Sequence, residues 1–229
     1  LAGLDMHIGS QVARIDSHLD GVLRLLELDA QLRAEGLAGD VRYLDIGGGL
    51  AVTYDSEQAT DIGAFASAIL PPVAASGLTL IVEPGRYLVG NAGLLATRVL
   101  YRKRSGGRDY VITDAGMNDL LRPSHYNAYH RIEAVRGPEA NGVYDIVGPV
   151  CESGDFFALG RRMADVVEGD LLAIRSAGAY GYVMASTYNS RPRIPEILVD
   201  GDRFAVVARR ETYEQLIAQE PVDVAWRTA

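Results

Sequence analysis

The stretch VRYLDIGGG, residues 41–49, carries the signal that decides the fold. A short apolar run that ends in three glycines is typical of a buried strand followed by a tight loop. Two similar runs, GLDMHI at 3–8 and LTLIVE at 78–83, stand before and after it. With helices between them, these runs predict parallel βα units whose strand ends meet at one edge of a sheet.

Helical spacing fills both gaps between these runs. Apolar residues recur every three or four positions from Ile15 to Leu26, and we expect that helix to end near Gly36. A second helical stretch contains Phe65, and we expect Pro71-Pro72 to interrupt it, because proline lacks the backbone N–H.

The pattern changes to mostly strands near residue 91. Ser105-Gly106-Gly107 and Asp200-Gly201 are hairpin turn signals, and residues 211–220 read as a short helix. We therefore predict an α/β domain over residues 1–90 and a β domain over 91–229. The strand-like segments of the second domain are 94–104, 109–116, 143–150, 170–180 and 196–210.

The composition excludes some classes of function. The chain has 229 residues, is 48% hydrophobic and 23% charged, and carries a net charge of −8, which argues against a nucleic-acid or anionic-membrane surface. No apolar run approaches the roughly 20 residues that span a bilayer. Cys151 is the single cysteine, so we expect a reducing compartment, the cytoplasm. Leu1 reads as the middle of a strand, so a targeting segment before it stays an open alternative.

Several polar stretches have two readings each. LDIGGGL (44–50) allows close approach of the backbone to an anion, or simply makes a tight turn. EPGRY (83–87) offers an arginine for a phosphate or carboxylate, or a surface ion pair. DAGMNDLLRPSHYNAYH (114–130) is a binding loop or an irregular connection. Taken singly, His7, Cys151 and Tyr180 are more typical of structural residues. None of these stretches predicts a metal site.

Together, six stretches in order resemble one family. They are HIGSQ, LDIGGG, EPGRYLV, DAGMNDLLRPSHYNAYH, GPVCESGD and GAYGYVMASTYNSRPR, and they run from residue 7 to residue 193. They are similar to the diaminopimelate decarboxylases, pyridoxal-phosphate-dependent enzymes of the alanine-racemase-like fold. The resemblance implies the last three βα units of a (β/α)8 barrel, followed by a C-terminal β-barrel domain. It also implies a homodimer with shared active sites, the cofactor pyridoxal 5'-phosphate, and decarboxylation of meso-2,6-diaminopimelate to L-lysine.

The resemblance assigns roles to named residues. Glu83 is implied to keep the pyridine nitrogen protonated, and His7 to stack on the ring. Cys151 is implied to be the catalytic proton donor, and Glu152 to bind the distal amine of the substrate. The other implied cofactor-binding residues are Ser10, Gly48, Gly49, Gly85, Arg86 and Tyr180. The other implied substrate-binding residues are Arg86, Arg122, Tyr126 and Tyr180.

Two features depart from the family. The only lysine is Lys103, in a predicted hairpin of the second domain, whereas the family's Schiff-base lysine precedes HIGSQ. Three parallel strands are also fewer than the eight of a full barrel. We therefore expect the C-terminal portion of a longer polypeptide, inactive by itself.

Two alternatives remain open from the sequence. One is a related decarboxylase acting on ornithine, arginine or a substrate of secondary metabolism. The presence of both Arg122 and Glu152 argues against an ornithine-type enzyme. The other is a non-catalytic partner that keeps the dimer surface, although Cys151 and Glu83 would then be retained without use.

Overall fold

The computed structural model describes residues 1–136, 142–221, 223 and 226. The chain divides into two compact units. Unit 1 comprises Leu1–Leu94 and Arg175–Tyr180, and unit 2 comprises Leu95–Ile174 and the described residues from Gly181 onward. Each unit is described below by itself.

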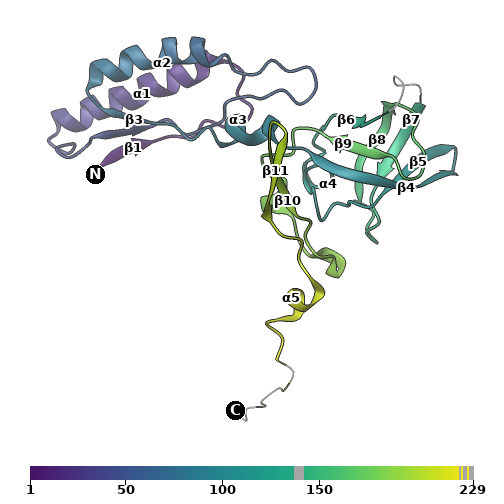
Figure 1. Cartoon of the computed structure of the whole chain (residues 1–229). Coiled ribbons are helices and arrows are strands. Elements are labelled where there is room, and N and C mark those ends of the chain that lie inside the picture. Colours follow the sequence, from purple (N-terminus) through teal and green to yellow (C-terminus); the bar gives the residue numbers. More distant parts are fainter. Residues whose placement is uncertain (137–141, 222, 224–225, 227–229) are drawn as a thin grey trace. The chain divides into compact units, whose positions relative to one another are not determined.

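Unit 1 is built on a parallel sheet in the order β1-β2-β3, and two long helices cover one of its faces (Figure 1). Gly3, Tyr43 and Thr79 are aligned in the ladder, so the carboxyl ends of the three strands meet at one edge. The predictions of three strands and two helices in this region are confirmed. The elements are β1 (Gly3–Asp5), α1 (Ile15–Ala34), β2 (Tyr43–Asp45), α2 (Ile62–Ser76), β3 (Thr79–Ile81), α3 (Gly85–Val89) and the short 3-10 turn Gly90–Ala92.

Helix α2 corrects one expectation. It continues through Pro71 and Pro72 to Ser76 instead of breaking at them. The two missing N–H groups cost helix hydrogen bonds, but the helix buries Phe65, Ile69 and Val73 in the core between helices and sheet. Burial of these apolar side chains outweighs the local loss.

Unit 2 contains a six-stranded sheet in the order β6-β9-β4-β5-β7-β8, which is antiparallel except between β5 and β7. The sheet curls so that its end strands, β6 and β8, approach each other, which makes it nearly closed. β10 and β11 form a separate hairpin (Figure 1). The strands are β4 (Leu95–Ser105), β5 (Arg108–Thr113), β6 (Ile132–Ala134), β7 (Gly142–Val147), β8 (Phe156–Met163), β9 (Leu171–Ile174), β10 (Glu196–Asp200) and β11 (Arg203–Ala208).

Both predicted hairpins and the short helix α5 (Tyr213–Ile217) are present. Gly106 and Gly107 have φ values of +58° and +78°, which suit the β4–β5 turn. Sequence analysis missed β6, β8 and the short helix α4 (Arg122–Tyr126). No helix in the described part of the chain is both long and apolar enough to cross a membrane.

The segment expected as one strand over 170–180 is divided. Only β9 is a strand, and Arg175–Tyr180 belongs to unit 1. Backbone contacts hold it there: Ala177 N–H donates to the Gly93 carbonyl at 2.9 Å and Gly178 N–H to the Gly90 carbonyl at 3.1 Å. A Cβ on Gly178 would lie 1.9 Å from the Val89 carbonyl oxygen, so only glycine fits. The predicted β domain of 91–229 is therefore not one continuous unit.

Candidate active site

The carboxyl edge of the unit 1 sheet gathers the first set of predicted residues. His7 and Ser10 follow β1, Gly48 and Gly49 follow β2, and Glu83 follows β3. Because the three strands are parallel and in register, these segments leave the sheet at the same edge. This edge is where parallel α/β sheets place their functional groups.

The glycine loop is packed against the loops on both sides of it. A Cβ on Gly48 would lie 2.2 Å from the Glu83 carbonyl oxygen, and one on Gly49 would lie 2.2 Å from the Gly9 carbonyl oxygen. Gly49 also has φ +86°. Gly48 N–H points at Nδ1 of His7, 3.4 Å away. The glycines are thus required for close loop packing, because Gly48 contacts both the His7 side chain and the Glu83 backbone.

His18 contacts this glycine loop from α1, and no pattern in the sequence indicates that contact. Its side chain is buried in α1, and its Nε2 lies 3.1 Å from the Gly48 carbonyl oxygen. Its ring meets Phe65 edge-on at 5.3 Å. The contact joins residues 30 positions apart, so helical spacing reveals only that His18 lies on α1.

Arg86 is the centre of the polar groups at this edge. Its guanidinium donates to the Tyr54 hydroxyl and, at 3.0 Å, to Oγ of Ser10. It also lies 4.8 Å from the centre of the Tyr180 ring. Three predicted residues, Ser10, Arg86 and Tyr180, are therefore brought together within unit 1. Tyr180 falls within residues 91–229, the predicted second domain, but Arg175–Tyr180 groups with the first unit.

Gln11 completes this edge and was also missed. Its side-chain amide exchanges two hydrogen bonds with the backbone of Val52, each 2.9 Å long. Its φ of +57° is unusual for a residue other than glycine. Gln11 fixes the Ser10 loop to the segment after the glycines.

In unit 2, Cys151 and Glu152 lie in the connection from β7 to β8, and both are exposed. Asp155 organises this connection from its buried side. Its carboxylate accepts the N–H of Val150 at 2.5 Å and the N–H of Met117 at 2.7 Å. Gly148 leaves room for it, because a Cβ there would lie 2.5 Å from both carboxylate oxygens. Burial raises the pKa of the Asp155 carboxyl, although the backbone N–H groups oppose that shift.

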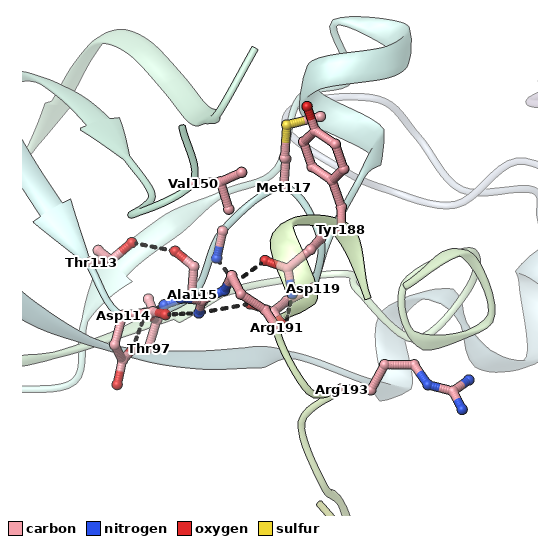
Figure 2. Close-up of polar contacts among 12 residues, drawn as sticks. Thr97, Thr113, Asp114, Ala115, Met117, Asp119, Val150, Tyr188, Arg191 and Arg193 are labelled. Atoms are coloured by element: carbon pink, nitrogen blue, oxygen red, sulfur yellow. Dashed lines mark hydrogen bonds and ion pairs between the residues drawn. The ribbon is translucent and has the colours of Figure 1, made fainter. Parts of the chain in front are cut away.

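A cavity of about 600 Å³ opens beside Glu152. Met117 and Tyr188, labelled in Figure 2, both line it. The Tyr188 hydroxyl donates to Oε2 of Glu152 at 3.1 Å, and this bond, followed by the charge of Glu152, raises the pKa of Tyr188. The lining residues are Met117, Asn118, Leu121, Glu152, Ser186, Thr187, Tyr188, Asn189 and Ser190.

Arg191 follows the segment 186–190 that lines this cavity and binds Asp114, the residue after β5 (Figure 2). Its Nε donates to Oδ1 of Asn118 at 3.1 Å, and its guanidinium donates to the Asp114 carbonyl at 2.6 Å. The same guanidinium lies 4.0 Å from the buried carboxylate of Asp119. Burial raises the pKa of Asp119, while the charge of Arg191 opposes the shift.

Arg122 and Tyr126 lie on α4, which directly follows the cavity residue Leu121 in the chain. Neither residue lines the cavity. The Arg122 side chain is buried, with Nη1 2.9 Å from Nε2 of His130. Tyr126 is 60% exposed. The predicted site residues thus form two sets: Arg122, Tyr126, Cys151 and Glu152 lie in unit 2, and the remainder lie in unit 1.

The sequence model of the family described as pyridoxal-dependent decarboxylase, C-terminal sheet domain, matches residues 19–178. The chain belongs to the pyridoxal-dependent decarboxylases.

Individual members of this decarboxylase family are similar over nearly the whole chain. Diaminopimelate decarboxylase of Pseudomonas aeruginosa is 49% identical over 219 residues, which are 95% of this chain and 52% of that protein. The Neisseria meningitidis protein of the same name is 48% identical, covering 96% and 53%. The crystal structure of diaminopimelate decarboxylase from Helicobacter pylori, complexed with L-lysine, is 39% identical with a TM-score of 0.88, covering 96% and 54%. The chain spans about half the length of the curated relatives it matches.

The residues of this decarboxylase chain fit most, but not all, of what pyridoxal phosphate needs. Unit 1 presents an imidazole, a hydroxyl, a guanidinium and a carboxylate at one sheet edge, a set suited to a phosphate and a pyridine ring. Unit 1 contains no lysine that could bind the cofactor covalently. Lys103 is exposed on β4 in unit 2, within the hairpin where the sequence placed it. Among the described residues, no group of three His, Cys, Asp or Glu side chains is arranged to hold a metal ion.

Proposed function

We propose that this chain is the C-terminal portion of a pyridoxal-phosphate-dependent decarboxylase that converts meso-2,6-diaminopimelate to L-lysine and CO₂. The observation that carries the proposal is that Glu152 lines the cavity of unit 2 and that the exposed thiol of Cys151 directly precedes it in the chain. A thiol can deliver a proton and a carboxylate can bind an ammonium group, and both are tasks of this reaction. The relatives that match nearly the whole chain bear this enzyme's name.

The proposed fold of the complete protein follows from the open edges of unit 1. β1 and β3 each have one neighbouring strand in the described sheet, and isolated parallel edges are unfavourable. We infer that β1 to β3 are the last three strands of a (β/α)8 barrel. Unit 2, with its nearly closed sheet, is the β-barrel domain.

At the edge of unit 1, each group has a proposed task in holding the cofactor. When bound, pyridoxal phosphate accepts the electron pair left by the departing CO₂. Glu83 holds a proton on the pyridine nitrogen, and His7 lies against the ring. Arg86 and Ser10, already joined at 3.0 Å, bind the phosphate with Tyr180. Gly48, Gly49 and Gly85 have no Cβ, so the backbone at these positions can approach the same anion closely.

In unit 2, the proposed tasks concern the substrate. Cys151 donates the proton that replaces CO₂, and Glu152 binds the ammonium group at the far end. Arg122 and Tyr126, together with Arg86 and Tyr180, contact the substrate carboxylates. In the proposed homodimer, Cys151 and Glu152 serve the cofactor of the neighbouring subunit. The partners are this small amino acid and a second copy of the chain, with neither nucleic acid nor membrane.

The test uses the complete polypeptide that contains these residues, loaded with pyridoxal phosphate. We expect CO₂ release from diaminopimelate and little from ornithine or arginine. Cys151→Ala lowers the formation of L-lysine by about 10²- to 10⁴-fold, the usual contribution of a positioned acid. Ser153→Ala, at the exposed neighbour of Glu152, is the matched control and keeps the wild-type rate. Preference for ornithine, or an unchanged rate in Cys151→Ala, would contradict the proposal.

A further inference from the structure

Tyr188 fixes the side chain that the proposed function assigns to the substrate's far amine. Its hydroxyl donates to Oε2 of Glu152 at 3.1 Å, and Gly154 N–H donates to Oε1 at 3.3 Å. Each carboxylate oxygen therefore has one donor from unit 2 itself. Since an ionised carboxylate accepts about four hydrogen bonds, both oxygens keep capacity for a cation.

The phenol remains a donor throughout the neutral range. The hydrogen bond to Glu152 is the main cause that raises the pKa of Tyr188, and the negative charge of Glu152 adds to it. A raised pKa keeps the hydroxyl protonated. The Tyr188 hydroxyl can therefore donate its hydrogen bond to Oε2 of Glu152 at neutral pH.

The backbone that carries Tyr188 is held in an unfavourable conformation. Asn189 and Ser190, the next two residues, have φ values of +55° and +56°. Such left-handed residues cost roughly 1 kcal/mol or more each and persist only where the surroundings enforce them. Contacts with the rest of unit 2 must therefore hold the turn that carries Tyr188 in this conformation.

Asn118 is the anchor that enforces this turn. Its backbone carbonyl accepts the Ser186 N–H at 2.9 Å, before Tyr188. Its side-chain Oδ1 accepts a hydrogen bond from Nε of Arg191, after Tyr188 in the chain, at 3.1 Å. Asn118 is buried, at 2% exposure. Both ends of the turn are therefore attached to one fixed residue.

The same turn forms the wall of the cavity beside Glu152. Met117 and Leu121 give that cavity an apolar side, while Glu152 and Tyr188 give it a charged and a polar side. Its volume of about 600 Å³ suits part of a small amino acid. An alkyl chain ending in an ammonium group matches these surfaces: carbon against the apolar side and charge against Glu152.

We propose that Tyr188 is a positioning residue that holds Glu152 for the ammonium group at the far end of the substrate. This inference rests on the proposed function, and it assigns to Tyr188 a part in substrate specificity that acts through Glu152. The proposed role of Tyr188 differs from that of Cys151, because Tyr188 takes no part in the proton transfer.

The test compares two competitive inhibitors of CO₂ release by the complete, cofactor-loaded polypeptide. L-Lysine has the far amine, whereas 6-aminohexanoate keeps the other amine and the far carboxylate but lacks that amine. We expect Tyr188→Phe to weaken inhibition by L-lysine about tenfold, the usual effect of a hydrogen bond to a charged group. Inhibition by 6-aminohexanoate stays within about twofold. KM for diaminopimelate rises by a similar factor, and kcat changes little.

Two controls distinguish positioning from loss of structure. Tyr101→Phe, at an exposed tyrosine of β4, leaves both inhibition constants unchanged. In a Glu152→Gln background, Tyr188→Phe adds little, because the two residues act as a unit.

Each failure has its own meaning. Equal weakening of both inhibitors, or no weakening of either, overturns the role of Tyr188 while CO₂ release stands. A wild-type polypeptide that releases no CO₂ from diaminopimelate overturns the proposed function itself.

Discussion

Gly48 is the residue at which two loops of unit 1 touch backbone to backbone. Neither its neighbours in sequence nor its own φ requires glycine, which distinguishes it from Gly47 and Gly49. The requirement comes from the Glu83 carbonyl, 2.2 Å from where a Cβ would be. The close contact brings the Gly48 and Glu83 segments together at the sheet edge that we propose holds the cofactor.

Gly48→Ala therefore forces the Glu83 segment away from β2. We expect the free energy of unfolding in urea to fall by about 1–3 kcal/mol, the usual cost of overpacking. Gly39→Ala is the matched control, because Gly39 has open space around its Cβ position. Equal free energies of unfolding for the two variants would contradict this prediction, because the Glu83 segment would then accommodate the added methyl group without loss of stability.

Among the elements, the β7–β8 connection and the segment after β5 are joined by one carboxylate. Asp155 accepts N–H groups from Val150 and Met117, which lie 33 positions apart in the chain. Met117 and Glu152, which follows Cys151, both line the cavity of unit 2. Cys151 and Glu152 thereby sit in an exposed turn that rests on a buried polar contact.

The pH dependence of stability tests this contact. Burial raises the pKa of Asp155 above its ordinary value of 3.8, so the folded state binds the proton more tightly than the unfolded state. The Asp155 contribution to the unfolding free energy then falls as pH rises from 3.8 through the raised pKa, and is constant above it. Asp155→Asn lacks this titration. We expect the stability advantage of the wild type over the variant to be largest in acid and to shrink toward neutral pH.

Urea unfolding at a series of pH values measures this difference. Asp202→Asn, in the exposed β10–β11 turn, is the control for removing one carboxylate that lies outside a buried contact. A gap between wild type and Asp155→Asn that widens toward neutral pH would show that the backbone donors outweigh burial.

At the scale of the whole molecule, the described residues carry both halves of a proposed site but not its lysine. Lys103 is exposed on β4 of unit 2, where it pairs with Tyr110 in the β4–β5 ladder. Together with the open edges of β1 and β3, this supports the proposal that the remaining barrel strands bring the covalent attachment.

We therefore expect the purified 229-residue chain to release no CO₂ from diaminopimelate, even with added pyridoxal phosphate. In the complete polypeptide, Lys103→Arg keeps the wild-type rate, because an exposed lysine on β4 has no task in the reaction. CO₂ release by the chain alone, or loss of activity in Lys103→Arg, would contradict the assignment of the missing lysine.

Some features were predictable because their causes are local. The strand and helix order of unit 1 follows from apolar spacing over 5 to 20 neighbouring residues. The hairpin turns follow from the left-handed freedom of Gly106, Gly107 and Gly201. Six motifs in order were enough to indicate the family, which the match over residues 19–178 supports.

The sequence by itself thus determined the βα order of unit 1, the hairpins of unit 2 and the family. Only the tertiary structure decided that α2 continues through its prolines, that Arg175–Tyr180 joins unit 1, and which partners the polar side chains have. His18 meets Gly48 across 30 positions and Tyr188 meets Glu152 across 36. The physical reason is that these contacts depend on packing between distant segments, for which neighbouring residues carry no signal.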